Sequence, residues 1–166
     1  LGSNNVMIGY YAGYSAANVS ALTLVGRDAG KAITSGINND FFSFQAGRDC
    51  TTGNRNLGVG NQAMYLCTTG YRNVSIGVVS ARALTTGYKN TFLGYYSGYN
   101  TTTGSNNIVI GHLTSASSAT VNNEITLGDS NITSLRCAES SISSLSDRRD
   151  KTDIVDLPVG LDFVNN

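Results

Sequence analysis

The stretch that decides the fold is residues 51–101, which read TTGNRNLGVGNQAMYLC (51–67), TTGYRNVSIGVVSARAL (68–84) and TTGYKNTFLGYYSGYNT (85–101). These three segments of 17 residues align without a gap, and each carries a glycine in the same slot. Across the chain this glycine slot is occupied by Gly9, Gly26, Ser43, Gly60, Gly77, Gly94, Gly111 and Gly128. The chain is therefore a tandem repeat of eight units, and a repeat decides the architecture before any local pattern does.

Three further slots confirm this frame. The slot before the glycine is apolar in every unit, so we expect it to point into a core: Ile8, Val25, Phe42, Val59, Ile76, Leu93, Ile110 and Leu127. The slot four residues before the glycine holds Asn5, Asn39, Asn56, Asn73, Asn90 and Asn107, with Leu22 and Glu124 as exceptions. The slot three residues after it is small: Ala12, Ala29, Ala46, Ala63, Ser80, Ser97 and Thr114.

A unit of 17 residues is too short for the helix pairs of helical repeat proteins, which need about 33 residues or more. Glycine in nearly every unit also disfavours helix, whereas short apolar runs between glycine turns favour strands. At about 3.3 Å per residue one unit makes a coil with a perimeter of about 56 Å, and stacked coils pair about 4.8 Å apart. We therefore predict an all-β fold, a parallel β-solenoid of about eight coils and about 38 Å over residues 1–128. We expect its asparagine slot to form a hydrogen-bonded ladder.

The composition is low in charge, at 13%, with 19 Gly, one Pro and no Trp. Residues 1–128 carry a net charge of +3, from seven Lys or Arg and four Asp or Glu. Residues 129–166 carry −3, from four and seven. This change predicts a second module after residue 128, and neither module is basic enough to indicate a nucleic-acid partner.

No apolar run reaches the length of a membrane span. The chain has no signal peptide and does not begin with Met, so we expect it to be a segment of a longer protein. The cysteines follow no metal-ligand spacing, and we expect no metal or cofactor. Cys50 and Cys67 lie one period apart and would stack in the core as thiols, although the spacing also allows a disulfide between coils.

Two outward slots carry basic and aromatic residues. One holds Lys31, Arg48, Tyr65, Arg82 and Tyr99, and the other holds Arg55, Arg72 and Lys89, with Tyr71 and Tyr88 beside it. Rows of Tyr and Arg are typical of surfaces that contact other molecules, which predicts a receptor-facing surface for a sugar or a protein. The alternative is that these rows only solubilise the solenoid and pair along it.

The pattern N-x-x-x-G-x-x-A resembles the head repeats of trimeric autotransporter adhesins over residues 1–128. Those heads are left-handed parallel β-rolls in which three chains associate. The period here is longer, and the Thr-Thr-Gly turn accounts for the extra residues. The resemblance implies a homotrimer.

The end of the chain is similar to bacteriophage tail fibres and tailspikes that carry a C-terminal intramolecular chaperone. The stretches concerned are ITLGDSNITSLRC (125–137), LSDRRDKTDI (145–154) and LPVGLDF (157–163). In that family the protein cuts a Ser-Asp peptide bond with help from a lysine five residues after the serine. This resemblance implies a junction at Ser146 and Asp147, with Ser146 and Lys151 as its catalytic residues.

The chemistry of this junction is reasonable, because a desolvated lysine with a lowered pKa can activate a serine hydroxyl. The alternative is that the charged segment only forms a solvated helix start, for which Ser146 or Asp147 suits the N-cap. The family's chaperone continues well beyond the segment present here, and we expect the environment of Lys151 to depend on that part. The enzymatic activity expected is at most one self-cleavage per chain.

The sequence therefore predicts a homotrimeric phage tail-fibre or tailspike segment that attaches to a host surface in the virion tail. Residues 1–128 would be the shaft, 129–146 an irregular or helical distal cap, and 147–166 the start of the chaperone. One alternative is the head of a bacterial trimeric adhesin. Another is a glycan-cleaving tailspike, which would need two carboxylates at one site, whereas residues 1–123 contain only Asp28, Asp40 and Asp49 as acids.

Overall fold

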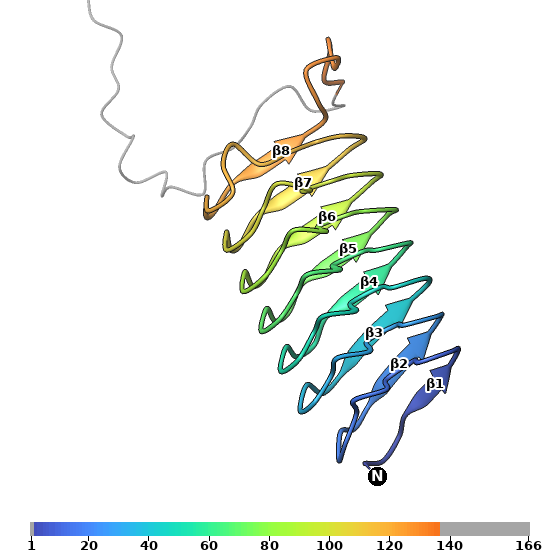
Figure 1. Ribbon diagram of the computed structural model, residues 1–166. Coiled ribbons are helices and arrows are strands. Elements are labelled where there is room, and N and C mark those ends of the chain that lie inside the picture. Colours follow the sequence, from blue (N-terminus) through green and yellow to red (C-terminus); the bar gives the residue numbers. More distant parts are fainter. Residues whose placement is uncertain (1, 137–166) are drawn as a thin grey trace, which may run out of the picture. The chain divides into compact units, whose positions relative to one another are not determined.

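The computed structural model describes residues 2–136 and shows eight short strands in one parallel sheet, paired in chain order (Figure 1). The strands are β1 (Val6–Ile8), β2 (Leu22–Val25), β3 (Asn39–Phe42), β4 (Leu57–Val59), β5 (Val74–Ile76), β6 (Thr91–Leu93), β7 (Ile108–Ile110) and β8 (Ile125–Leu127). Each strand is followed by a connection that returns the chain beneath it (Figure 1). The described residues contain no helix.

The register of the sheet follows the repeat. Leu57 pairs with Val74 and Val74 with Thr91, so paired residues are always 17 positions apart. The prediction of an all-β parallel solenoid with 17-residue coils is confirmed. Eight strands enclose seven complete turns rather than the expected eight, because β1 opens the stack and β8 ends it.

The expected direction of the slot before the glycine is wrong. Phe41, two residues before the glycine slot, is fully buried, and its neighbour Phe42 lies on the other face and is half-buried. Leu93 and Leu127, also in the slot before the glycine, are 45% and 53% exposed. The asparagine slot is buried, and side chains alternate along a strand, so the residue three positions further on must point outward.

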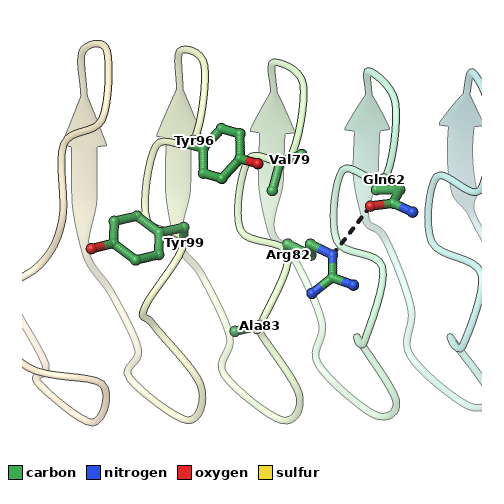
Figure 2. Close-up of a pocket in the computed structure, with 6 residues that line it drawn as sticks. All are labelled: Gln62, Val79, Arg82, Ala83, Tyr96 and Tyr99. Carbon is green, nitrogen blue, oxygen red and sulfur yellow. Dashed lines mark hydrogen bonds between the residues drawn. The ribbon is translucent and has the colours of Figure 1, made fainter.

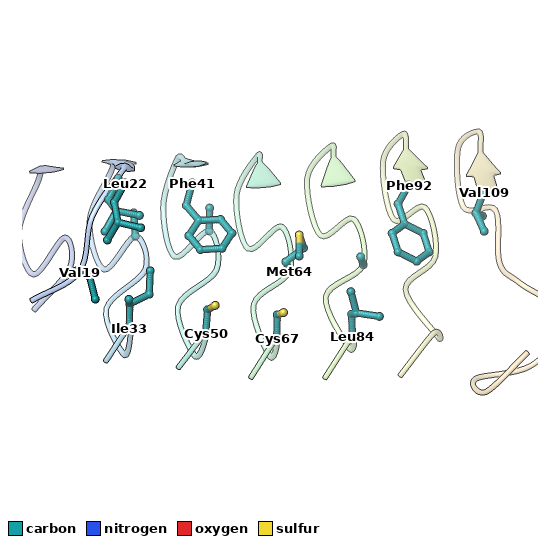
Figure 3. Packing of buried hydrophobic residues seen from close by; sticks show 14 of the residues in the cluster. Val19, Leu22, Ile33, Phe41, Cys50, Met64, Cys67, Leu84, Phe92 and Val109 are labelled. Carbon is teal, nitrogen blue, oxygen red and sulfur yellow. The ribbon is translucent and has the colours of Figure 1, made fainter. Parts of the chain in front are cut away.

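The inner face of the sheet is packed by matched volumes within each coil (Figure 3). Phe41 and Phe92 point inward opposite Gly47 and Gly98, where an added Cβ would overlap the aromatic ring. In β4 the inward residue is Gly58, and the corresponding glycine is replaced by the buried Met64. A large and a small residue thus fill the interior in either order, as close packing of the core requires.

The expected asparagine ladder is confirmed. The Asn56 side-chain amide donates to Asn39 Oδ1 at 3.1 Å and to the Gly70 carbonyl oxygen at 2.8 Å, and its own Oδ1 accepts from the Asn73 backbone N–H at 3.0 Å. The same pattern repeats at Asn73 and Asn90. These bonds satisfy polar backbone groups inside the coil, where an unpaired group would be costly.

The glycine slot forms the corner after each strand. Gly77 has a φ of 142°, and a Cβ added to it would clash with the carbonyl oxygen of Gly94 in the next coil. Ser43, the exception, adopts a φ of 108°. Close stacking of successive corners therefore favours a residue without a side chain.

Cys50 and Cys67 are free, buried thiols one coil apart, as the first of the two readings predicts. The hydrogen bond between the two thiols, together with burial, holds the pKa of Cys67 well above its ordinary value. The described residues up to Thr133 form one compact unit. Of the expected cap, residues 129–136 are described and contain a turn but no helix or strand. The rest of the cap and the whole expected chaperone segment, with Ser146, Asp147 and Lys151, lie outside the described residues.

Candidate functional site

The outward face of the sheet is a largely apolar surface, here called the outer apolar face. Its first row is the slot before the glycine, Ile8, Val25, Phe42, Val59, Ile76, Leu93, Ile110 and Leu127. Its second row is Val6, Thr23, Asp40, Leu57, Val74, Thr91, Ile108 and Ile125. Every one of these side chains is exposed or half-buried in the single chain.

The outer apolar face contains one charged side chain, Asp40. Seven steps of about 4.8 Å make the face about 34 Å long. Soluble monomers rarely leave so long an apolar strip in water, and such strips mark protein–protein contacts. This face is the first candidate functional surface of the molecule. Its first row is the slot before the glycine, which was expected to point into the core.

The predicted row of Arg48, Tyr65 and Arg82 is brought together by the stacking of coils. The guanidinium carbon of Arg48 lies 4.0 Å from the centre of the Tyr65 ring. The guanidinium carbon of Arg82, which belongs to the coil after Tyr65, lies 4.9 Å from the centre of the same ring. Arg48 also donates to Asp49 through Nε at 2.7 Å, and this hydrogen bond raises its pKa. Tyr65 is thus held between two cations, an arrangement stabilised by the negative face of the ring.

The two ends of this row differ in their partners. Lys31 Nζ lies 3.3 Å from Asp28 and 4.8 Å from the centre of the Tyr11 ring. Tyr99 is 46% exposed and contacts Tyr96 edge to face, with ring centres 6.3 Å apart. Lys31 is therefore neutralised, whereas Tyr99 offers an open ring face.

The second predicted row forms on the turn before the strands. Arg55, Arg72 and Lys89 are all exposed there. Tyr71 and Tyr88 stack with ring centres 4.9 Å apart and planes 2° from parallel. This row is a solvent-exposed ladder of stacked side chains.

A hollow of about 360 Å³ lies on the three connections that follow β4, β5 and β6 (Figure 2). It is lined by Gln62, Val79, Arg82, Ala83, Tyr96 and Tyr99. The prediction named Arg82 and Tyr99 but missed Gln62, Val79, Ala83 and Tyr96. A signal was present, because glutamine occupies the same slot in two successive units, at Gln45 and Gln62. Their side-chain amides are hydrogen-bonded at 3.0 Å.

The acidic residues of the solenoid do not resemble a hydrolytic pair. Asp28 is buried and lies within 3.4 Å of both Arg27 and Lys31, and Asp49 is paired with Arg48. Asp40 stands apart on the outer apolar face. Among residues 2–136 no group of three His, Cys, Asp or Glu side chains could hold a metal ion. Over the same residues, no helix could cross a membrane.

Comparison of the chain with models of known protein families, with curated protein sequences and with solved structures gives no match. The function is therefore argued from the geometry of the solenoid and from the motifs of the sequence.

Proposed function

We propose that this chain is a segment of a homotrimeric fibre in which three solenoids pack through their outer apolar faces. The observation that carries this proposal is the exposure of large apolar side chains along the whole sheet. Ile76, Leu93 and Ile108 are between 37% and 45% exposed in the middle of the stack. Complete burial of a side chain of this size contributes about 1.5–3 kcal/mol, and burying the part that is still exposed here contributes a corresponding share.

A three-fold arrangement suits this surface. A fibre with cyclic symmetry repeats one patch on every chain, and closure leaves no apolar strip in water. The surfaces that carry Tyr65, Arg82 and Tyr99 lie on the connections rather than on the sheet, so packing through the sheet leaves them accessible. The resemblance to trimeric adhesin heads supports the same number of chains.

The fibre's role is attachment to a host surface, and we place it in a phage tail because of the motif at residues 145–163. In this proposal Ser146 and Lys151 catalyse hydrolysis of the peptide bond between Ser146 and Asp147. Lys151 takes a proton from the attacking hydroxyl, the C–N bond breaks with a proton passing to the Asp147 nitrogen, and water supplies the oxygen of the new Ser146 carboxylate. The cut releases a chaperone that sets the register of the three chains. Register is a physical need here, because a slip of one unit preserves nearly every slot.

Sedimentation equilibrium tests the assembly. We expect a mass three times the chain mass of 17.4 kDa, and a monomer at micromolar concentration would contradict the proposal. The junction is tested separately in the protein that carries its full C-terminal segment. There, Ser146→Ala should leave a single uncut band on a denaturing gel, whereas continued cutting would remove Ser146 from the mechanism.

A further inference from the structure

We propose that the hollow beside Arg82 binds an acidic sugar, a saccharide that carries a carboxylate or a sulfate. This inference rests on the proposed attachment function and names the class of ligand at one place on the fibre. The hollow's volume of about 360 Å³ falls within the range of small-ligand sites, roughly 300–1,000 Å³. One or two sugar rings would fill such a space.

The guanidinium of Arg82 is held in place on two sides. Its Nε donates to Gln62 Oε1 at 3.2 Å, and its plane lies over Tyr65 at 4.9 Å. The two terminal nitrogens point away from Gln62 (Figure 2). Such a fixed fork can donate two parallel hydrogen bonds to a carboxylate or sulfate without losing much further conformational freedom.

Arg82 also lacks a neutralising partner. The ion pairs among residues 2–136 join Arg27 and Lys31 to Asp28, and Arg48 to Asp49. Arg82 is half-buried, next to the aliphatic Val79 and Ala83, so its charge is less well hydrated than a free guanidinium. An anion in the hollow would therefore be favoured by a charge that no described carboxylate balances.

The other wall of the hollow is aromatic. Tyr96 and Tyr99 line it, and Tyr96 is braced by Tyr95 at 4.6 Å between ring centres, which in turn stacks on His112 at 5.3 Å. The negative face of a tyrosine ring attracts the C–H edge of a sugar, and its hydroxyl can hydrogen-bond to sugar hydroxyls. The Arg82 guanidinium beside the rings of Tyr96 and Tyr99 is thus complementary to a sugar ring that carries both apolar C–H groups and an anionic group.

The first coil supplies an internal comparison. Tyr10, Tyr11 and Tyr14 occupy the slots of Tyr95, Tyr96 and Tyr99. However, the cation next to them, Lys31, is paired with Asp28 at 3.3 Å. The same tyrosine pattern without a free cation should therefore bind acidic sugars poorly.

The test is binding of the intact protein to immobilised glycans in matched acidic and neutral forms, with sialyllactose against lactose and oligogalacturonate against its methyl ester. We expect the acidic member of at least one pair to bind more tightly. Arg82→Gln and Tyr99→Ala should each weaken that binding by about tenfold or more. The control variants Arg27→Gln and Tyr14→Ala should bind like the unchanged protein.

Two results would overturn the inference. One is equal binding of acidic and neutral members, or of neither, by a protein that sediments as a trimer; the fibre proposal would then stand without this site. The other is an equal loss in Arg82→Gln and Arg27→Gln, which would mean general attraction to positive charge. A protein that sediments as a monomer contradicts the fibre proposal itself, whatever the glycan result.

Discussion

Phe41 and Phe42 are neighbours in β3, yet they lie on opposite faces of the sheet and serve different purposes. Phe41 is fully buried and fits against Gly47 of its own coil. Phe42 belongs to the outer apolar face, where the single chain leaves it only half-buried. The inner face holds one chain together, whereas the outer face has apolar side chains that only a second molecule can bury. A periodic apolar slot therefore indicates an interface as readily as a core.

The largest effect should come from placing a charge on the outer apolar face. Leu93→Asp would bury three carboxylates between the chains of a trimer, and unpaired buried charges are strongly unfavourable. We expect this variant to sediment as a folded monomer. Leu113→Asp is the matched control, because Leu113 is also 45% exposed but lies on the connection after β7. Loss of the trimer in both variants would contradict the assignment of the interface to the sheet.

The next effect separates the two phenylalanines. Phe41→Ala should lower the free energy of unfolding by about 3–5 kcal/mol, because it leaves a cavity in the core. Phe42→Ala should cost far less in a monomeric background such as Leu93→Asp, and should instead weaken trimer association. Urea unfolding of both variants in that background checks this. Equal losses would mean that the two faces are not functionally distinct.

The hydrogen bonds of the inner face should matter nearly as much. Asn56→Ala removes donors to Asn39 and Gly70 and leaves the Asn73 N–H without its acceptor. Unsatisfied buried groups cost about 1–3 kcal/mol each, so we expect a loss of about 2–4 kcal/mol in urea unfolding. Asn54→Ala, on the exposed side of the same turn, should cost less than about 1 kcal/mol. A small effect at Asn56 would show that the ladder contributes little to stability.

A smaller effect tests the pairing of volumes within a coil. Gly47→Met should destabilise the chain by about 1–3 kcal/mol, because its side chain would overlap Phe41 and overpacking carries that cost. The double variant Phe41→Gly with Gly47→Met copies the pair found at Gly58 and Met64, so it should be more stable than Phe41→Gly alone. A double-mutant cycle by urea unfolding measures this coupling. Additive effects would contradict it.

The smallest effect concerns the last coil, where Glu124 takes the asparagine slot. Hydrogen bonds from Ser117 and Thr126, at 2.8 Å and 2.9 Å, lower the pKa of its carboxyl below the ordinary 4.5. A lowered pKa means that this stabilisation is present above 4.5 and is lost as the pH falls through the folded-state value. The protection factor of the Ser117 amide against hydrogen exchange should therefore fall on acidification below that pH. In Glu124→Gln, which cannot titrate, it should not.

Much of the fold could be predicted from the sequence, because the period fixes which residues stack. The coil length, the parallel register, the corner glycines, the asparagine ladder and the stacked thiols all follow from slots such as those of Gly77 and Asn56. The direction of the strand side chains could not be predicted from apolar character alone. Both the slot of Phe41 and the slot of Phe42 are largely apolar, and only the buried asparagine slot decides which of them points inward.

The candidate surfaces were predicted less completely. Arg48, Tyr65 and Arg82 share a slot, so stacking alone places them together. The hollow also needs Gln62, Val79 and Tyr96, which come from a different slot, and Ala83 from a third. Their meeting depends on how the connection folds over the coil. The proposed junction at Ser146 and Lys151 stays a prediction outside the described residues.

The central claim is that the outer apolar face is buried between copies of this chain. Methyl NMR of the unmodified protein with a soluble paramagnetic agent tests it without altering the surface. Leu93 and Leu113 are equally exposed, at 45%, in the single chain. We predict that the Leu93 methyls are protected to the same degree as those of the core residue Leu84, while the Leu113 methyls are strongly broadened. Equal broadening of Leu93 and Leu113 would contradict the account.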